Sequence, residues 1–401
     1  MSLKLYDFEV MNLSSKVNKK KSMTDVEINE KYESGEHRIV TEQGAFKLDL
    51  IGAIFSQKKY NLKPEFQRRI TWDNKKRSKL IESFIMNIPV PPVFLYEEDY
   101  ASYVVMDGLQ RISAIMDFYR DVYELKGLEE WSELNGKKYS ELPKKVREGI
   151  DRRQLSVITL LKESAEDRIT ADKMKKMVFE RLNTGGVQLE DQEIRNALFG
   201  GKFNDCCMML SENKTFKQLW GIDGITGIEV SENSHDLDEE DNLLAAKNKL
   251  YRRMYDVELV LRYFAMRNVK NYSGKLSKYL DEYLNFANTY NDEQIKILSD
   301  NFNCAIANAY KAFDKKAFCI FREGKGWSQP QNMIYDAMML VMSDATILDK
   351  KISSDIEKNI EGLKKLYINN ADAFNGKKQS KADIIQRANL LKKYILDNVV
   401  E

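Results

Sequence analysis

The stretch that decides the fold of the first half of this chain is Val105-Met106-Asp107-Gly108-Leu109-Gln110-Arg111. Hydrophobic residues from Tyr103 to Met106 predict a buried strand, and Gly108 predicts a tight turn after it. Apolar residues then recur at helical spacing, at Ile112, Ile115, Met116 and Tyr119. The sequence therefore predicts a strand, a turn and a helix, with the polar side chains of Asp107, Gln110 and Arg111 at the junction.

This junction has the chemistry of an anion site. The first backbone N–H groups of a helix lack partners within the helix, and they favour a phosphate or another anion. Arg111 adds a guanidinium, which binds phosphate oxygens in pairs. We therefore look for function here first.

Two further motifs accompany the junction. The stretch Leu62-Lys63-Pro64-Glu65-Phe66-Gln67-Arg68-Arg69-Ile70-Thr71-Trp72 precedes an expected helix with Leu80, Ile81, Phe84, Ile85 and Ile88 on one side. The stretch Val178-Phe179-Glu180-Arg181-Leu182-Asn183-Thr184-Gly185-Gly186-Val187-Gln188-Leu189 ends another expected helix in a Gly-Gly turn.

Together these three motifs resemble the N-terminal domain of the GmrSD type of modification-dependent restriction enzymes, a family built on a ParB/sulfiredoxin-like fold. The resemblance runs from about Phe46 to Phe203, with the motifs in the expected order. The family's usual wording is Asp-Gly-Gln-Gln-Arg, and Leu109 replaces the first Gln in this chain. The residues that carry over are Asp107, Gly108, Gln110 and Arg111, together with Phe66, Gln67 and Arg68.

The resemblance implies a nucleotide-binding pocket formed by the two arginine-bearing elements, with nucleoside triphosphate hydrolysis in several relatives. In such a pocket Arg68 and Arg111 clamp phosphate oxygens. Gln110 positions a water, and Asp107 holds Mg²⁺ or polarises that water. The expected catalytic residues are Asp107, Gln110 and Arg111, with Asp107 also the metal ligand. The expected nucleotide-binding residues are Phe66, Gln67, Arg68, Arg69, Gly108, Asn183 and Thr184. The implied cofactors are a nucleoside triphosphate and Mg²⁺.

Structural alternatives stay open for these residues. Asp107 is a preferred residue type for capping a helix, and Arg111 can pair with it as a structural bridge. Gln67 can satisfy buried backbone groups instead of touching a ligand. The turn from Asn183 to Gly186 either closes a helix without touching ligand or forms part of the pocket floor.

Composition limits the classes of function. The chain has only two histidines, His37 and His235, so it lacks the clustered histidines of the His-metal nuclease commonly attached to this family. It also has no Gly-x-x-x-x-Gly-Lys-Ser/Thr loop, which excludes a conventional P-loop ATPase. Its formal net charge is +1, but Lys63 to Lys79 holds seven basic residues against two acidic ones.

Cysteine use and hydropathy indicate the compartment. The four cysteines show no zinc-ligand spacing, and we expect buried, reduced thiols. No apolar run approaches membrane-spanning length, and residues 1–23 lack the hydrophobic core of a signal peptide. We expect a cytoplasmic protein with no membrane partner.

With 401 residues, the chain predicts two domains. We expect an α+β protein with a polar N-terminal extension at 1–34, a ParB/sulfiredoxin-like nucleotide-binding domain at 35–203 and an α-helical domain at 204–401. In the helical part, arginines alternate with aromatics between Tyr251 and Phe264, a pattern typical of core packing with partly extended arginines and also of nucleic-acid binding.

Two hypotheses of function follow from these features. The first is a nucleoside triphosphatase whose turnover controls defence against phage or foreign DNA. The second is a non-catalytic module that senses nucleotide or DNA and recruits a separate partner nuclease. A nuclease that uses Asp107 directly is a weaker third reading, because no paired carboxylate motif accompanies it. The sequence leaves the oligomeric state open.

Overall fold

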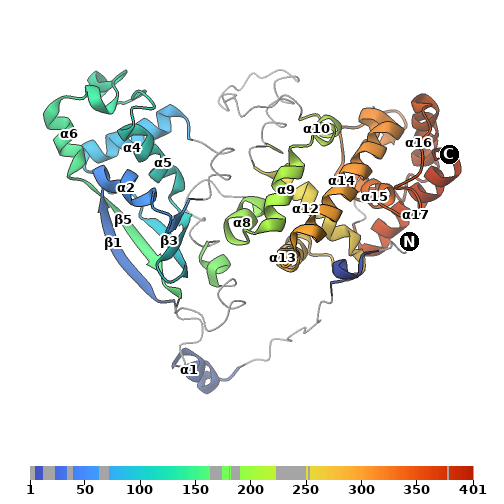
Figure 1. Ribbon diagram of the computed structural model, residues 1–401, viewed down its shortest axis with the longest axis horizontal. Coiled ribbons are helices and arrows are strands. Elements are labelled where there is room, and N and C mark those ends of the chain that lie inside the picture. The colour runs from blue at the N-terminus through green and yellow to red at the C-terminus, as the bar shows by residue number, and fades with distance from the viewer. Residues whose placement is uncertain are drawn as a thin grey trace. The chain divides into compact units, whose positions relative to one another are not determined.

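The computed structural model describes residues 5–11, 23–33, 39–62, 72–162, 174–179, 181, 190–222, 250–251, 253–376 and 379–400. The chain forms two compact units (Figure 1). The first unit, called here the α/β unit, is Asn18–Leu198. The second, the helical unit, combines Met1–Val17 with Phe199–Glu401.

The α/β unit is built on a mixed five-stranded sheet with the strand order β1-β5-β3-β4-β2. The strands are β1 (Thr41–Lys47), β2 (Tyr60–Asn61), β3 (Val93–Asp99), β4 (Ser102–Asp107) and β5 (Gln154–Leu160). β1 is antiparallel to β5 and β3 is antiparallel to β4, whereas β5 runs parallel to β3 and β2 runs parallel to β4. Because of these directions, β2 and β4 end at the edge of the sheet where β3 begins.

Helices pack beside this sheet and complete its core (Figure 1). They are α2 (Ile51–Phe55), α4 (Asn74–Met86), α5 (Leu109–Tyr119) and α6 (Lys144–Asp151). The unit also contains α1 (Asp25–Glu33) and α8 (Asp191–Leu198), with further helical residues at 174–179. Ile81 of α4 and Ile112 of α5 are fully buried in one cluster with Val93 of β3. Helical spacing of apolar residues therefore places one face of each helix in the core.

The ends of α4 follow from local chemistry. Asp73 caps its first turn by accepting a hydrogen bond from the backbone N–H of Lys76 at 2.7 Å. Asn87 ends the helix in the left-handed conformation with φ 59°, two residues before Pro89. Ile88, expected on the apolar face of the helix, therefore lies beyond its end and is 48% exposed.

The helical unit contains most of the second half of the chain. Its helices are α9 (Lys202–Ser211), α10 (Lys214–Trp220), α12 (Tyr255–Arg267), α13 (Leu276–Ala287), α14 (Asp292–Phe313), α15 (Asn332–Met342), α16 (Ile356–Asn369) and α17 (Lys381–Asn398). A small hairpin of β6 (Phe321–Arg322) and β7 (Gly326–Trp327) joins α14 to α15. The α15 helix is buried along its whole length, which makes it the centre of this unit.

Residues 5–11 belong to the helical unit and differ from the polar extension expected at 1–34. Glu9, in the 3₁₀ turn Asp7–Glu9, is fully buried and binds Arg267 through two oxygens at 2.6 and 2.8 Å. Phe8 packs edge-on against Tyr290, with ring centroids 5.4 Å apart. This largely apolar segment within the expected polar extension is thus fixed by one buried ion pair and one aromatic contact.

The arginine and aromatic residues of α12 pack as core. Tyr263 and Phe264 are buried, and Arg262 forms a two-oxygen ion pair with the buried Asp336 of α15 at 2.6 and 2.5 Å. Of the two interpretations of this segment, the structure supports packing with paired arginines.

The α+β class with a mainly helical second half is confirmed by these elements. The expected strand at 103–106 is present within β4. The division between units falls after Leu198 rather than at the expected Phe203, because Phe203 is buried against Phe264 and Tyr283 in the helical unit. The ParB/sulfiredoxin-like comparison stays a prediction.

Candidate functional site

The turn between β4 and α5 needs glycine for two reasons. Gly108 has φ +97°, a left-handed conformation that L side chains rarely adopt. A Cβ atom on Gly108 would also lie 2.6 Å from Val93 Cγ2 and 3.1 Å from Arg111 Nη2. Since Gly108 is also the N-cap residue and has no side chain, it leaves the first turn of α5 without a side-chain cap.

Arg111 is held over this turn by two oxygens. Its Nη2 donates to Asp107 Oδ2 at 2.6 Å and to the backbone carbonyl of Pro92 at 3.2 Å. The Arg111 side chain is 13% exposed and the Asp107 side chain is 49% exposed. Arg111 Nε is buried and has no hydrogen-bond partner among the described residues. The guanidinium is therefore positioned but incompletely satisfied, while the carboxylate beside it is open to solvent.

Gln110 has a different contact from the expected one. Its Oε1 accepts a hydrogen bond from the backbone N–H of Trp72 at 3.1 Å. Trp72 is the residue that ends the Phe-Gln-Arg stretch, so Gln110 fixes the end of that stretch at the start of α5. Whether Gln110 also positions a water stays a prediction.

The other end of the same stretch is fixed nearby. β2 pairs in parallel with β4, with Tyr60 opposite Tyr103 and Asn61 opposite Val104. The chain enters the stretch at the edge of the sheet where β4 delivers Asp107, and it leaves the stretch at Trp72. The Phe66, Gln67, Arg68 and Arg69 positions themselves lie outside the described residues, as do Asn183 and Thr184.

Of the structural alternatives for Asp107 and Arg111, the structure contains one. Asp107 does not cap α5, because its carboxylate turns to Arg111. The Asp107–Arg111 pair is present, four residues apart along the chain. A pair with one half-exposed partner stabilises a fold by about 0–1 kcal/mol, so this pair alone adds little to the stability of the α/β unit.

Sequence reasoning missed three parts of the site. They are the Pro92 carbonyl, the packing of Val93 under Gly108 and the backbone N–H of Trp72. The first two come from the strand paired with β4, a contact that local sequence does not specify. The contact of Trp72 could have been suspected from the sequence, since Trp72 is the last residue of the Phe-Gln-Arg stretch.

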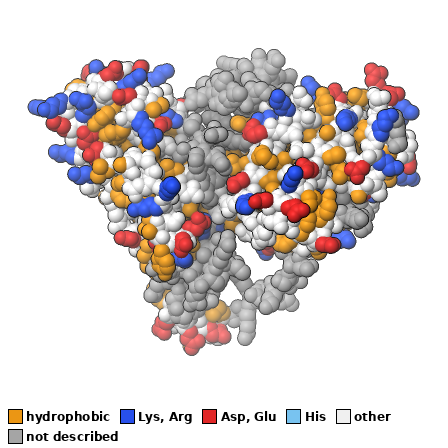
Figure 2. Space-filling view, in the orientation of Figure 1, with side chains coloured by type: hydrophobic (Ala, Val, Ile, Leu, Met, Phe, Trp, Pro, Cys, Tyr) orange, Lys and Arg blue, Asp and Glu red, His pale blue; other side chains and the backbone are white. Residues whose placement is uncertain are grey.

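The basic residues at the start of α4 are partly neutralised. Arg77 pairs with Asp117 at 3.2 Å and Lys79 pairs with Glu129 at 2.8 Å, whereas Lys75 and Lys76 are exposed. Figure 2 shows Lys and Arg side chains over the part of the α/β unit that holds α4 and α6, with Asp and Glu side chains between them. On this face the basic surplus of the sequence is interrupted by acidic residues.

At this junction the structure offers one carboxylate, Asp107, as a metal ligand. Within the described ranges, no group of three or more His, Cys, Asp and Glu side chains could hold a metal ion. Mg²⁺ is commonly bound through one or two carboxylates together with substrate phosphates. Asp107, half-exposed beside Arg111, matches that arrangement.

The cysteines are free thiols, as expected. Cys206, Cys207 and Cys319 are buried and Cys304 is half-buried. Burial raises the pKa of each of these thiols, which keeps them protonated. None of the described helices has the length and apolar character needed to span a bilayer.

Comparison with known proteins identifies the α/β unit. Residues 51–200 match the family model described as the GmrSD restriction endonuclease, N-terminal domain. No curated protein and no solved structure gives a significant match. The matched range contains β2 to β5, the Gly108 turn and the Arg111 contacts described above. Because the family is that of a restriction endonuclease, it indicates a role of the restriction or defence type. Over residues 51–200, the chain is therefore similar to the N-terminal domain of the GmrSD restriction endonuclease.

Proposed function

We propose that the α/β unit binds a nucleoside triphosphate at the β4–α5 junction and hydrolyses it with Mg²⁺ in defence against phage or foreign DNA. The observation that carries this proposal is the Arg111 guanidinium. It is held at the uncapped start of a helix, with Nε buried and without a partner among the described residues. An anion placed there would meet a guanidinium and free backbone N–H groups together.

The geometry supports an exchange of partners at Arg111. Without ligand, Asp107 neutralises the guanidinium at 2.6 Å. A phosphate group would compete for Arg111 and release the Asp107 carboxylate, which is already half-exposed. The released carboxylate could then bind Mg²⁺ or orient the attacking water. When bound, Mg²⁺ would neutralise charge on the phosphate oxygens.

Chain connectivity supports a second phosphate contact from the Phe-Gln-Arg stretch. Trp72 is held at Gln110, and Arg69 is only three residues away along the chain. We propose that Arg68 or Arg69 supplies the second phosphate contact, beside Phe66 and Gln67.

Phosphate release from ATP, GTP, CTP and UTP tests the proposal, with and without Mg²⁺ and with and without DNA. We expect Arg111→Ala to lower turnover by about 10²–10³-fold, as removal of one preorganised donor commonly does. Asp107→Asn keeps an acceptor for Arg111 and removes the carboxylate, so we expect loss of turnover with retained nucleotide binding.

Arg120→Ala is the matched control, because Arg120 is exposed at the opposite end of α5. Equal losses in the Arg111 and Arg120 variants, or a large fall in the melting temperature with Arg111→Ala, would contradict a role in catalysis.

A second candidate is a module that senses nucleotide or DNA without catalysis and recruits a separate nuclease. The observation that favours it is the closed Asp107–Arg111 pair, in which the guanidinium already has a carboxylate partner. Salt-dependent DNA binding that is lost in Arg68→Ala and Arg69→Ala, without phosphate release from any of the four nucleotides, would support this candidate.

A further inference from the structure

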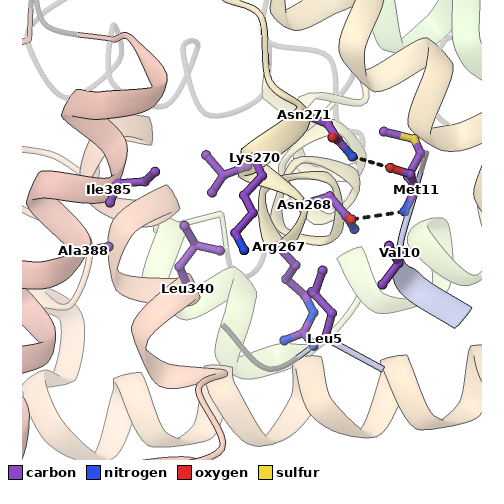
Figure 3. Close-up of a pocket in the computed structure, with 11 residues that line it drawn as sticks. Leu5, Val10, Met11, Arg267, Asn268, Lys270, Asn271, Leu340, Ile385 and Ala388 are labelled. Atoms are coloured by element: carbon purple, nitrogen blue, oxygen red, sulfur yellow. Dashed lines mark hydrogen bonds between the residues drawn. The ribbon is translucent and has the colours of Figure 1, made fainter. Parts of the chain in front are cut away.

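A cavity of about 340 Å³ is lined by residues of the helical unit, none of which belongs to the proposed nucleotide site (Figure 3). It is bordered by the end of α12 and the following 3₁₀ turn Val269–Asn271, by α15, by α17 and by residues 5–11. Its volume equals that of roughly eleven water molecules at about 30 Å³ each, and it falls at the lower end of the range for ligand pockets.

One wall of the cavity is the N-terminal segment, and this wall is firmly attached. Met11 N–H donates to Asn268 Oδ1 at 3.4 Å, and Asn271 Nδ2 donates to the Met11 carbonyl (Figure 3). Arg267, which also lines the cavity, is bound on its other side to Glu9. Hydrogen bonds and an ion pair therefore hold this wall of the cavity in place.

The lining divides into an aliphatic part and a donor part. The aliphatic part consists of Leu5, Val10, Met11, Val269, Leu340, Ile385 and Ala388. No aromatic ring and no carboxylate is among the residues that line the cavity. The volume is thus shaped for a saturated hydrocarbon group rather than for a stacked ring.

The donor part contains an unsatisfied group and a charge. Asn268 is 3% exposed, and its Nδ2 is buried with no hydrogen-bond partner among the described residues. Figure 3 shows the Lys270 side chain extending into the cavity. A buried donor without an acceptor destabilises the folded state, and a ligand acceptor would remove that cost.

We propose that this cavity binds an aliphatic monocarboxylate, with the alkyl chain among Leu340, Ile385 and Ala388 and the carboxylate between Asn268 Nδ2 and Lys270 Nζ. Arg267 does not supply the charge, because Glu9 already neutralises it. The ligand also contacts Leu5, Val10 and Met11, so its binding holds residues 5–11 in place.

The binding test uses octanoate, decanoate and dodecanoate with the full chain, and decylamine and 1-decanol as comparison compounds. We expect saturable binding of at least one carboxylate by calorimetry, with a rise in melting temperature that grows with its concentration. Decylamine should not bind, and 1-decanol should bind more weakly than decanoate. Amide hydrogen exchange at residues 5–11 should slow when the carboxylate is bound.

Two pairs of variants test the site. Lys270→Gln should weaken carboxylate binding by about tenfold, the size of one charge-assisted contact, whereas Lys393→Gln, exposed on α17 outside the cavity, should not. Asn268→Asp keeps the acceptor for Met11 N–H and replaces the donor with a charged oxygen, so it should abolish binding. Ala388→Leu should fill the cavity and have the same effect.

Three results would overturn the proposal: decylamine binding as tightly as decanoate, equal loss in the Lys270 and Lys393 variants, or no saturable binding by any carboxylate. The two lysine variants change only exposed side chains, so they decide the question even if Asn268→Asp or Ala388→Leu fails to fold. Because the nucleotide site lies in the other unit, this result is independent of the phosphate-release assay.

Discussion

At the scale of single residues, the β4–α5 junction needs a glycine backbone conformation at position 108 and an arginine side chain at position 111. Gly108 turns the chain so that Arg111 lies back over the end of β4, where Asp107 and the Pro92 carbonyl receive it. The positive φ of Gly108 and the close approach of Val93 are thus conditions for the position of the guanidinium. A substitution at Gly108 should affect both stability and the site.

We expect Gly108→Ala to destabilise the α/β unit by about 1–3 kcal/mol more than Gly136→Ala does. Both positions have positive φ, +97° and +83°, so both variants carry the same kind of backbone cost. Only at Gly108 does the new methyl group meet a neighbour, whereas nothing lies within 4 Å at Gly136. Urea unfolding of the two variants measures the difference, and equal free energies of unfolding would contradict the steric argument.

The two tyrosines on Asp151 make a pH-dependent contribution. Tyr119 and Tyr139 each donate a hydrogen bond to the Asp151 carboxylate at 2.9 Å. Burial, and then the hydrogen bond to Asp151, raise the pKa of Tyr139 to about 12. An unfolded tyrosine has a pKa of about 10. The folded state therefore holds this proton more tightly, so the stabilisation is complete below about pH 10 and is lost as the pH rises towards about 12.

As the pH rises from about 9 to about 11, the free energy of unfolding should therefore fall less in the Tyr139→Phe variant than in the native chain. Urea unfolding at the two pH values measures this loss. Tyr100→Phe is the control, since Tyr100 is 73% exposed and should leave the pH dependence unchanged. A steeper loss in Tyr139→Phe than in the native chain would reverse the sign and refute the argument.

At the scale of helices and strands, sequence pattern predicted the elements whose apolar residues repeat over several turns or positions. The strand at 155–160 and the helices α13 and α17 were predictable because their apolar faces are continuous. The α6 helix has only a weak sequence pattern, since Ile150 is its one buried residue. The β6–β7 hairpin was missed because two-residue strands leave no periodicity.

The candidate site was predictable in its residues and not in its contacts. Asp107, Gly108 and Arg111 stand together in the sequence, and the structure brings them together. The contact with Pro92 depends on the pairing of β3 with β4, and the contact with Trp72 depends on the parallel pairing of the edge strand β2 with β4. Strand order and register are set by long-range packing, which a single local pattern does not encode.

The N-terminal segment offers a test at this scale. Glu9→Ala removes the partner of Arg267, which is 1% exposed, and leaves an uncompensated buried charge. We expect a loss of about 3–5 kcal/mol in the stability of the helical unit. Asp7→Ala changes an exposed carboxylate two residues away and should alter stability by less than about 0.5 kcal/mol. Chemical denaturation of both variants checks this, and similar losses would show that Arg267 is compensated from elsewhere.

At the scale of the whole molecule, the helical unit is built from two segments that are far apart in the sequence. Residues 5–11 and the chain from Phe199 onward form one unit, with the family domain between them. The N-terminal segment contributes the Glu9 carboxylate, the Phe8 ring and one wall of the cavity. The helical unit is therefore incomplete without residues that precede the family domain by many positions.

Two shortened proteins test this arrangement. A protein of residues 199–401 should be less stable by about 3–5 kcal/mol than one in which residues 1–17 are joined to residue 199 by a flexible Gly/Ser linker, because only the second retains Glu9 for Arg267. Thermal unfolding followed by circular dichroism compares them. Equal melting temperatures would show that the N-terminal segment adds nothing to the helical unit.

The buried Glu9–Arg267 pair also has a consequence for synthesis on the ribosome. Glu9 is made first, yet its partner is separated from it by the whole family domain and follows more than two hundred residues later. Since domains fold as they emerge, the family domain can reach its native state while the helical unit still waits for its second portion. A nascent chain arrested before α12 would thus carry a folded sheet while Glu9 still lacks the arginine that neutralises it in the finished protein.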